Sequence, residues 1–493
     1  MEGKVLAPAN DVADGQGTRR SKEGGEKTMW RIYNQIGIGY NVSNNSLETD
    51  TYMVINGRSE LADVRPFRAT LYDVQVVGDI SRVVAPPYDI IDEEKKSRLL
   101  ARSPYNVVRL ELPVEEGEEE FWKRSASVFR AWKRSGVLVS DEERCLYVHR
   151  QSFRQPSGEM ITRTGIIAAL RCTDFQDGMV MPHERTFPRT RSERLKLLRA
   201  CRANFSQVFM VFRDRDQEVP PLVEGAFAEP PLLEFGDEEG VEHQLWRLHE
   251  RETQENLARI LAGKRFIIAD GHHRYETALT FSREGAKEED VGWPGRYVSV
   301  AMVRAEDPGL VILPVHRLVR EVSLHLEETV RKLEGFFDVR LVFEDPAERR
   351  GPLGPALEAR ERAAFFMMTR RGTYLLTLRD GVMPEKEIAI RGSARLRTLD
   401  VSVLHHLVLR RCLGLDPDVM AEAGDLCFTP WESEAADAVA GGRAEVAFLL
   451  RPAGMDDIWS IAEGGERMPH KSSYFHPKFP SGLIIYDHET AFS

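Results

Sequence analysis

The sequence predicts an α+β fold in which strands and helices are mixed along the chain. Residues 145–153 and 164–171 are two strand-like apolar segments, and the Pro-Ser-Gly turn at 156–158 would let them pair as a hairpin. Residues 257–282 run in the order helix, short strand, turn, helix, each with the apolar spacing of its element. A mixed αβ architecture accounts for both patterns.

The folded part of the chain is predicted to begin at about residue 62. Asp92 is placed to cap a helix that runs through Leu100, because its carboxylate can accept the free N–H groups of the first turn. Residues 106–113 alternate in polarity, which predicts a strand. The other two elements are a strand at 83–85, broken by the double-proline turn that follows it, and a helix at about 115–135 with Phe121, Phe129 and Trp132 on its buried side.

The middle of the chain is predicted from the same spacing rules. Apolar residues over 257–261 predict a helix that ends at Gly263, and the apolar run 266–269 predicts a short strand. Tyr275 and the residues three, four and seven positions later share one face of a further helix. A helix is also expected at about 191–202, and the Pro-, Glu- and Gly-rich segment 216–240 is expected to be a surface loop.

The chain is divided into four parts on these patterns. Residues 325–395 suggest a small αβ unit with its own sheet, and they lack polar clusters. The last part is expected to contain helices at 401–413 and 455–463 and strands at 446–451 and 483–486. The four parts are a disordered extension at 1–61, a core at 62–324, an accessory αβ subdomain at 325–397, and a C-terminal part at 398–493 that returns to the core.

Composition narrows the class of protein. The net charge of -11 argues against a general nucleic-acid coat, which would be basic, although it leaves room for a local basic cleft. The five cysteines are scattered without metal-ligand spacing, which favours reduced thiols in a cytoplasmic protein. No stretch approaches the roughly 18 apolar residues of a membrane span, and no hydrophobic signal region is present at the start, so we expect no membrane partner.

The most informative segment is the turn at 270–274, which reads Asp-Gly-His-His-Arg. It lies between the strand and the helix predicted around it, so the free N–H groups and the dipole of the helix start favour an anion there. Asp270, His272 and His273 are the candidate catalytic groups, and Gly271 and Arg274 the candidate phosphate-binding groups. The alternative is a structural turn whose histidines cap the helix or stay solvated, but two adjacent histidines cannot both point into a core.

A basic stretch precedes this segment and is the second candidate. Between Arg185 and Arg202 there are seven basic residues and one acidic residue, so charge pairing within the helix cannot account for most of them. Arginine suits a phosphate because its planar fork carries several donors. We take Arg185, Arg194, Arg202 and His183 as candidate phosphate ligands, and Glu184 as a candidate acid–base or metal-binding group; a solvated helix face is the alternative.

The third candidate is a loop near the end of the chain, dense in cations and hydroxyl groups. Such a cluster fits a phosphate or nucleotide cradle, and a basic surface loop is the equal alternative. Its candidate ligands are Lys471, Ser472, Ser473, Tyr474 and Lys478.

Several enzyme classes are excluded by the absence of their motifs. The chain has no Gly-x-Ser-x-Gly elbow, no Walker loop and no Gly-x-Gly-x-x-Gly dinucleotide turn. Phosphate recognition by the turn and the basic clusters remains. Phosphoryl transfer needs positioned cations, often Mg²⁺, and a carboxylate that takes the proton of the acceptor. The candidate carboxylates are Asp89, Glu111, Glu184 and Asp270, and Asp270 adjoins the turn directly.

Taken together, the motifs resemble the DUF1015 family, which is also labelled SpoOJ/ParA/ParB/repB-like. The resemblance spans about residues 62 to 490 and is strongest at ADGHHRYETA and KSSYFHPK. The other segments that carry it are RPFRA (65–69), VVAPPYDII (83–91), NVVRLELP (106–113), MPHERT (181–186) and ILPVHRLV (312–319).

The resemblance implies a ParB/sulfiredoxin-like core, because the turn is similar to the glycine-basic box that binds nucleotide phosphates in that wider group. It further implies a nucleotide, ATP or ADP, at Gly271 to Arg274, together with Mg²⁺, and transfer to a small molecule, with the free-serine kinases as the nearest enzymatic analogy. A sulfiredoxin role needs a cysteine in the box, and residues 270–274 contain none.

The sequence therefore predicts a nucleotide-dependent phosphotransferase that acts on a small molecule, with free serine as one candidate acceptor. The first alternative is a ParB-like nucleotide-binding regulator associated with DNA or a protein partner. The second is a ligand sensor without catalysis. The oligomeric state is left open.

Overall fold

The computed structural model describes residues 54–55, 58–59, 61–115, 119–155, 158–186, 188–285, 292–320, 322, 325–344 and 351–493. The chain forms two units, Met1–Glu60 and Leu61–Ser493. In the first unit, the described residues are the short antiparallel pair β1 (Val54–Ile55) and β2 (Arg58–Ser59). The predicted disorder of 1–61 otherwise falls outside the described residues.

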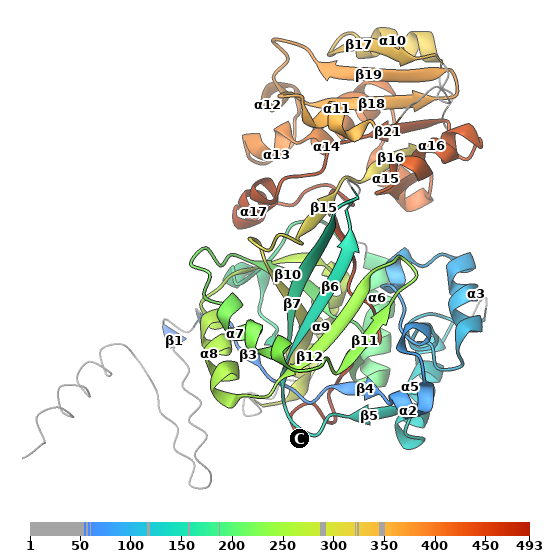
Figure 1. The fold of residues 1–493 in the computed structure, drawn as a ribbon. Coiled ribbons are helices and arrows are strands. Elements are labelled where there is room, and N and C mark those ends of the chain that lie inside the picture. The colour runs from blue at the N-terminus through green and yellow to red at the C-terminus, as the bar shows by residue number, and fades with distance from the viewer. Residues whose placement is uncertain are drawn as a thin grey trace, which may run out of the picture. The chain divides into compact units, whose positions relative to one another are not determined.

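The predicted α+β class is confirmed, because the described part of the second unit contains two larger sheets with helices around them (Figure 1). The first of these has nine strands among the described residues, in the order β11-β12-β6-β7-β14-β10-β13-β8, with β3 also paired to β7. Its strands are β3 (Val64–Arg65), β6 (Leu146–Arg154), β7 (Met160–Arg171), β8 (Val180–Pro182), β10 (Val208–Phe212), β11 (Leu233–Gly236), β12 (Glu242–Leu248), β13 (Phe266–Asp270) and β14 (Tyr297–Arg304).

The centre of this sheet is buried on both faces. On β10, Met210 and Phe212 belong to one apolar cluster, and Phe209 and Val211 belong to the other. A strand covered on both faces reads as a continuous apolar run, which is why β10 and β13 show no polar alternation. Helices α8 (Arg251–Ala262) and α9 (His272–Glu284) contribute Leu257 and Tyr275 to the first cluster.

The last segment of the chain returns to the first sheet through two short strand pairs. β22 (Tyr474–His476) pairs with β15 (Val311–Leu313), and β23 (Tyr486–Asp487) pairs with β9 (Ala203–Asn204). These pairs lie on either side of residues 477–485, which cross the first sheet.

Buried contacts fix this crossing. The ring of Phe479 packs on the rings of His149 and Phe209. The fully buried guanidinium of Arg163, on β7, donates to the carbonyl oxygens of His476, at 3.0 Å, and of Pro477. A buried guanidinium is expensive unless its donors are paired, so these bonds fix the path of the crossing segment.

The other sheet has six strands among the described residues, in the order β17-β19-β18-β21-β16-β20. It takes strands from both sides of the boundaries predicted at 325 and 397, so the predicted accessory subdomain covers only part of this sheet and its limits stay a prediction. The strands are β16 (His316–Val319), β17 (Phe337–Phe343), β18 (Ala364–Thr369), β19 (Gly372–Leu378), β20 (Leu426–Thr429) and β21 (Val446–Leu449), and the nearby helices include α10 (Leu326–Leu333), α11 (Gly354–Glu358) and α16 (Glu432–Ala440).

Several predicted elements are confirmed. β6 and β7 form the predicted hairpin, and α8 ends at Gly263 as expected. Asp92 caps the first predicted helix, and its Oδ1 accepts from the N–H of Lys95 at 2.7 Å. The confirmed helices are α3 (Glu93–Arg102), α5 (Phe121–Arg134), α6 (Pro188–Cys201), α9 and α17 (Met455–Glu463), and the helix predicted at 401–413 is α14 (Asp400–Val403) followed by the π-helix η7 (Leu404–Cys412).

The strand predicted at 106–113 is wrong, because this segment forms a helical turn, α4 (Val108–Glu111). The Asn106 side chain explains the difference: its Oδ1 accepts from the N–H of Val108 at 3.0 Å, and its Nδ2 donates to two upstream carbonyl oxygens. An asparagine that bonds the backbone two residues later starts a turn and competes with a strand. The alternation of polarity did not reveal that bond.

Three other predicted segments differ from the structure. At 83–85 there is one isolated bridge, from Ala85 to Ser481, because Val83 closes the turn of η1 (Ile80–Arg82). The segment 216–240, predicted as a loop, contains two short helices and β11, and the predicted closing strand at 483–486 begins only at Tyr486. The remaining short elements are α2 (Val74–Val77), α7 (Pro220–Glu224), α12 (Pro384–Glu387), α13 (Ala394–Thr398), α15 (Pro417–Ala423), β4 (Thr70–Tyr72), β5 (Leu138–Ser140), η2 (Tyr88–Ile90), η3 (Phe175–Asp177), η4 (Gly225–Ala228) and η5 (Pro294–Arg296).

Within the described residues, no helix combines the length and the apolar character needed to cross a bilayer. The five cysteines are all free thiols.

Replacing Asn106 by alanine should test its role in starting α4. The change leaves a buried N–H and two carbonyl oxygens without their partner, so the free energy of unfolding should fall by about 3 kcal/mol. Urea denaturation measures this loss. Ser97→Ala, on the exposed face of α3, is the matched control and should change stability by less than about 0.5 kcal/mol. Equal stability of the two variants would contradict the role of Asn106.

Candidate functional site

The strand β13 ends at Asp270, and α9 begins two residues later with a glycine between them. Gly271 has φ +87°, and no side chain caps the start of α9. The first N–H groups of a helix have no partner within the helix, so an uncapped start presents donors and the positive end of the helix dipole. The predicted strand–turn–helix at this segment is therefore confirmed.

Glycine is required at residue 271 for two reasons. Its φ lies in the left-handed region, which costs other residues energy. In addition, a Cβ at this position would lie 2.8 Å from Nε and 3.0 Å from Cζ of Arg274. The missing side chain thus lets the guanidinium fold back over the turn.

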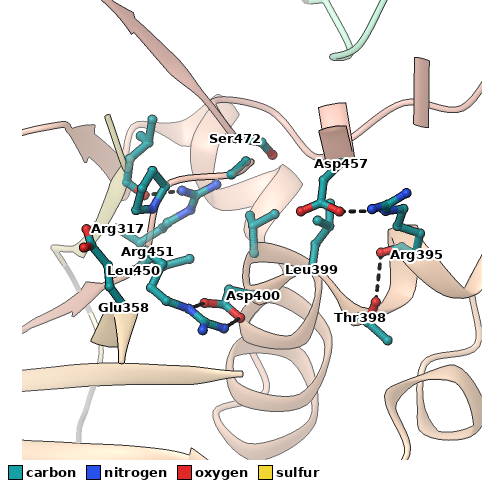
Figure 2. Close-up of a pocket in the computed structure, with 14 residues that line it drawn as sticks. Arg317, Glu358, Arg395, Thr398, Leu399, Asp400, Leu450, Arg451, Asp457 and Ser472 are labelled. Carbon is teal, nitrogen blue, oxygen red and sulfur yellow. Dashed lines mark hydrogen bonds and ion pairs between the residues drawn. The ribbon is translucent and has the colours of Figure 1, made fainter. Parts of the chain in front are cut away.

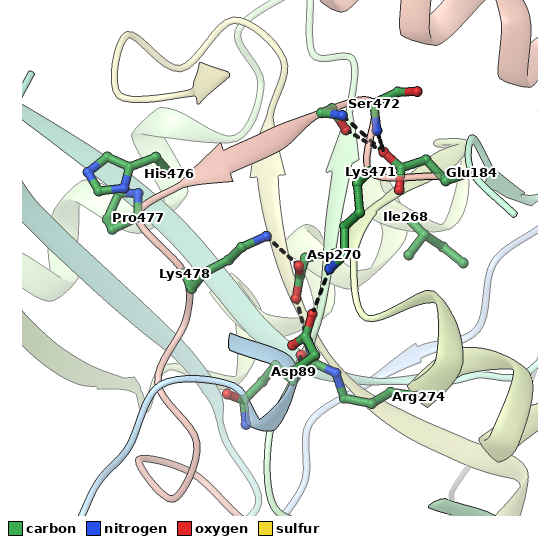
Figure 3. A network of polar contacts seen from close by, with 12 residues as sticks. Asp89, Glu184, Ile268, Asp270, Arg274, Lys471, Ser472, His476, Pro477 and Lys478 are labelled. Carbon is green, nitrogen blue, oxygen red and sulfur yellow. Dashed lines mark hydrogen bonds and ion pairs between the residues drawn. The ribbon is translucent and has the colours of Figure 1, made fainter. Parts of the chain in front are cut away.

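Asp270 joins two cations from distant parts of the chain (Figure 3). Its carboxylate accepts from Nζ of Lys478 and from Nη2 of Arg274, and Nη1 of Arg274 donates to the carbonyl oxygen of Gln207 at 2.6 Å. Burial raises the pKa of Asp270, but the charges of Lys478 and Arg274 outweigh it and hold the pKa well below its usual range. Asp270 is therefore ionised, and it positions both cations.

A second lysine reaches the same place from the loop before β22. Nζ of Lys471 lies 3.4 Å from Oδ2 of Asp89, on η2, and Figure 3 shows the lysine between Asp89 and the loop. Its side chain is 44% exposed, whereas that of Lys478 is 9% exposed. Burial lowers the pKa of Lys471, but Asp89, Glu184 and Asp270 raise it above its usual value. Lys471 is thus a charged and accessible group.

Glu184 anchors the loop that carries Lys471. Its Oε1 accepts from the backbone N–H groups of Ser472, at 2.9 Å, and Ser473, at 3.0 Å, and lies 3.1 Å from Oγ of Ser473. Burial raises the pKa of Glu184, but hydrogen bonding to His183 and the nearby charge of Lys471 hold it well below the usual range. A carboxylate that accepts two backbone N–H bonds is a strong structural anchor and a weak base.

His183 is the buried partner of that anchor. Its Nδ1 lies 2.7 Å from the carbonyl oxygen of Ile268, which can only accept, so Nδ1 carries a proton. Its Nε2 lies 2.8 Å from Oγ of Ser473. His183 therefore links β13 to the loop before β22 and is fully buried.

His272 is the residue of this site whose hydrogen-bonding capacity is not fully used. Its Nε2 is buried and, among the described residues, has no hydrogen-bond partner. The centroid of its ring lies 4.8 Å from that of His183. Burial and His183 hold the pKa of His272 well below the usual value, so the imidazole is neutral at pH 7. Burial also lowers the pKa of the neighbouring His273.

We call these residues the turn cluster. The structure brings together, from four segments of the chain, most of the predicted site residues. Its members are Asp89, His183, Glu184, Asp270, Gly271, His272, His273, Arg274, Lys471, Ser472, Ser473, Tyr474 and Lys478.

Three predicted phosphate ligands lie outside the turn cluster. Arg194 is buried on α6, where its Nη1 donates to the carbonyl oxygen of Glu111 at 2.8 Å and its guanidinium lies 4.2 Å from the ring centre of Tyr88. Arg202 follows α6, and its carbonyl oxygen accepts from the N–H of His488. Arg185 is exposed and points to a different cavity, which is described below. Their positive charges are therefore spread from before α6 to just after it and do not gather at one phosphate site.

Some contributors had only weak signals in the sequence. Gln207 acts through its carbonyl oxygen, which no motif reveals. Arg467 donates from Nη1 to the carbonyl oxygen of Glu184 at 3.1 Å, and its place four residues before Lys471 was its only signal. Asp89 was considered only as one of four carboxylates.

Metal binding by protein groups alone is not indicated. Within the part of the chain that the structure describes, no three His, Cys, Asp or Glu side chains are arranged to hold a metal ion.

The protein is therefore of the α+β class. Charged residues from distant parts of the chain surround the start of one helix, α9. The chain belongs to the family described as protein of unknown function, DUF1015, which matches residues 64–402. The predicted family is confirmed. No curated protein matches the sequence.

Three solved structures are similar at a low level. A conserved hypothetical protein from Pyrococcus furiosus has a TM-score of 0.33 at 12% identity, over 66% of this chain and 97% of that chain. A free serine kinase mutant in complex with ADP has a TM-score of 0.33 at 12% identity, over 65% and 92%. A C-terminally truncated SbnI from Staphylococcus aureus has a TM-score of 0.30 at 11% identity, over 64% and 86%. Similarity at this level carries no argument about function.

Replacing Gly271 by alanine should separate its two roles. The left-handed backbone alone should cost about 1 kcal/mol. The contact of the new Cβ with the Arg274 guanidinium should add to this and weaken the ion pair with Asp270. Urea denaturation should therefore show a loss of about 2 kcal/mol or more.

The control is Gly240→Ala. Gly240 has φ +76°, and its Cβ would meet nothing within 4 Å, so it reports the backbone cost alone. If both variants lose the same stability, the close approach of Arg274 has no energetic role.

Proposed function

We propose that the chain transfers a phosphoryl group from a nucleotide, ATP or ADP, to a small molecule at the turn cluster. The observation that carries this proposal is the uncapped start of α9 beside the buried, unpartnered Nε2 of His272. Buried polar atoms are nearly always hydrogen-bonded, so an unpartnered ring nitrogen at a helix start that no side chain caps calls for a ligand.

The phosphates would be held by the N–H groups at the start of α9 and by Lys478 and Lys471. Preorganised donors in a partly buried site stabilise charge without rearranging during the reaction. Asp270 fixes Lys478 and Arg274 in advance, so its role is positioning. Its low pKa makes Asp270 a weak base, so another group must take the proton from the acceptor hydroxyl.

His272 is the group that would take the proton of the acceptor. In this step the acceptor oxygen attacks the terminal phosphorus, the bond to the bridging oxygen breaks, and the leaving nucleotide keeps the electron pair. The proton of the acceptor passes to Nε2, which is free to accept it when the neutral imidazole carries its hydrogen on Nδ1. The phosphate charge raises the pKa of His272 and so strengthens it as a base.

Mg²⁺ fits this proposal as an ion shared with the nucleotide. In phosphoryl-transfer sites it is held by one or two carboxylates together with the phosphates. The side chain of Asp89 is 31% exposed, and its contact with Nζ of Lys471 is long, at 3.4 Å. Its carboxylate would therefore be able to bind Mg²⁺. The ion would neutralise charge on the phosphate oxygens.

The core is proposed to be ParB/sulfiredoxin-like, as the family resemblance implies. The alternative function, a ParB-like nucleotide-binding regulator, would use the same phosphate site. It differs only in predicting nucleotide binding without transfer, so the same experiment separates the two.

The test is incubation with ATP or ADP, Mg²⁺ and a panel of small hydroxyl compounds that begins with free serine, with products detected by ³¹P NMR. Lys478→Met should reduce the rate by about 100-fold or more, because a fixed cation at the phosphates is lost. His272→Gln should reduce it by about 100-fold as well. Lys332→Met, on the exposed side of α10, is the control and should leave the rate unchanged.

Nucleotide binding without product from any acceptor would reject the phosphotransferase and support the regulatory alternative. Full activity of Lys478→Met would instead reject the turn cluster as the site.

Nucleotide binding should take up protons. The phosphates raise the lowered pKa of His272, so in mildly acidic solution the complex should bind a fraction of a proton more than the free protein. By linkage, affinity should increase as the pH falls towards 6. Calorimetric titration with ADP in buffers of different ionisation enthalpy measures the uptake.

His272→Gln should abolish this uptake, and His325→Gln, an exposed histidine before α10, should keep it. Unchanged uptake in His272→Gln would show that another group titrates.

A further inference from the structure

Two cavities lie beside the loop that carries Lys471, and they differ in charge. The smaller has a volume of about 360 Å³ and is lined by Arg317, Arg395 and Arg451 together with three carboxylates (Figure 2). Each of these arginines is engaged: Arg451 with Asp400, Arg395 with Asp457 at 2.7 Å, and Arg317 with two backbone carbonyl oxygens. This cavity therefore has no spare positive charge.

The larger cavity has a volume of about 620 Å³, which lies within the usual range for small-molecule sites. Four arginines and two carboxylates line it, so positive charge is in excess in a chain of net charge -11. The charged residues are Arg185, Arg391, Arg410, Arg467, Asp418 and Glu466.

Both carboxylates are already occupied. Glu466 accepts from the backbone N–H and the hydroxyl of Ser393, the latter at 2.6 Å. Asp418 lies 2.9 Å from Nη2 of Arg410 and 3.9 Å from Nη1 of Arg185. Neither carboxylate neutralises Arg391 or Arg467.

Arg391 differs from the other three arginines of this cavity. Among the described residues, no hydrogen bond or ion pair involves its guanidinium, and the side chain is exposed. Glu466 accepts from the backbone N–H of Ser393, two residues further on, and this bond holds the segment against the cavity. Arg391 is therefore held at the cavity wall with all its donors available.

The two histidines in the wall, His405 and His406, add no charge at neutral pH. Burial holds the pKa of each below its usual value. Both lie on the π-helix η7, and such irregular helices are frequent at functional sites. Nε2 of His405 accepts from Arg317, and Nδ1 of His406 accepts from Arg410.

The cavity adjoins the turn cluster through Arg467. Its guanidinium lines the cavity, donates to the carbonyl oxygen of Glu184 at 3.1 Å, and lowers the pKa of His272 by its charge. The imidazole of His470 also donates from Nδ1 to the carbonyl oxygen of Arg185 at 2.9 Å. The cavity and the turn cluster therefore share Arg467, which would contact a ligand in the cavity from the side of the proposed base.

We propose that this cavity binds the acceptor, and that the acceptor is a small anion with a carboxylate or phosphate group and a free hydroxyl. The role as acceptor site rests on the proposed phosphotransferase, whereas anion binding itself follows from the excess of arginines over carboxylates in the cavity wall. An arginine fork matches a carboxylate or phosphate with two parallel hydrogen bonds, and no described residue competes for the guanidinium of Arg391.

The test measures binding of malate, 3-phosphoglycerate and glycerol 3-phosphate by calorimetry, with neutral glycerol as the uncharged comparison. Wild type should bind at least one of the anions and not glycerol. Arg391→Gln should weaken that binding by about tenfold or more, because a charge-assisted bidentate contact is lost. It should leave the affinity for ADP unchanged, since the nucleotide is assigned to the turn cluster.

The matched control is Arg331→Gln, an arginine in the last turn of α10, which should bind the anions as wild type does. Binding of none of the three anions, or unchanged binding by Arg391→Gln, would overturn the proposal. An equal loss of ADP affinity in Arg391→Gln would also overturn it, because the cavity would then belong to the nucleotide site. Anion binding that depends on Arg391 supports the cavity as an anion site even if no phosphate is transferred. Failure of the proposed phosphotransferase can therefore be distinguished from failure of the anion site.

Discussion

The turn cluster depends on the carboxylate of Asp270, which is shared by Arg274 and Lys478. Two mostly buried cations so close together would repel each other and lose their hydration without this anion. The same carboxylate ties β13 and α9 to the C-terminal segment, and Gln207 extends the link to β10 through Arg274. The site is thus assembled by electrostatic contacts across the first sheet, on a scaffold of strands buried on both faces.

A second anchor, Glu184, holds the remaining side of the site. Because its Oε1 accepts from two successive backbone N–H groups, the loop of Ser472 and Ser473 keeps one conformation. His183, which follows β8, reinforces this loop by bonding both Ser473 and the Ile268 carbonyl oxygen of β13. Lys471 then projects from a fixed backbone. Its side chain is more exposed than that of Lys478 and its contact with Asp89 is long, at 3.4 Å. The Lys471 side chain can therefore move to contact a bound phosphate, whereas the Lys478 side chain is held in position by Asp270 before any ligand binds.

The sequence predicted the local parts of this arrangement and missed the distant ones. The strand, turn and helix around residues 270–274 follow from apolar spacing and a glycine, which are short-range signals. The pairing of Asp270 with Lys478 spans 208 positions, and no local pattern encodes it. Glu184 illustrates the same limit: its position next to His183 suggested acid–base chemistry, whereas its distant backbone partners make it an anchor. At Asn106 a side-chain bond to the backbone overrode the alternation of polarity that predicted a strand.

Transfer between two anions faces a general electrostatic difficulty, because the acceptor and the nucleotide phosphates repel each other. At 4 Å, two unit charges of like sign cost about 4 kcal/mol near a protein surface. The cations of the turn cluster are assigned to the nucleotide phosphates, so an anionic acceptor needs positive charge of its own. Arg467 joins the two proposed binding sites, since it lines the cavity and donates to the carbonyl oxygen of Glu184 in the turn cluster. The excess positive charge of the cavity is therefore placed where a reaction between two anions needs it, and this links the proposed acceptor class to the chemistry of the turn.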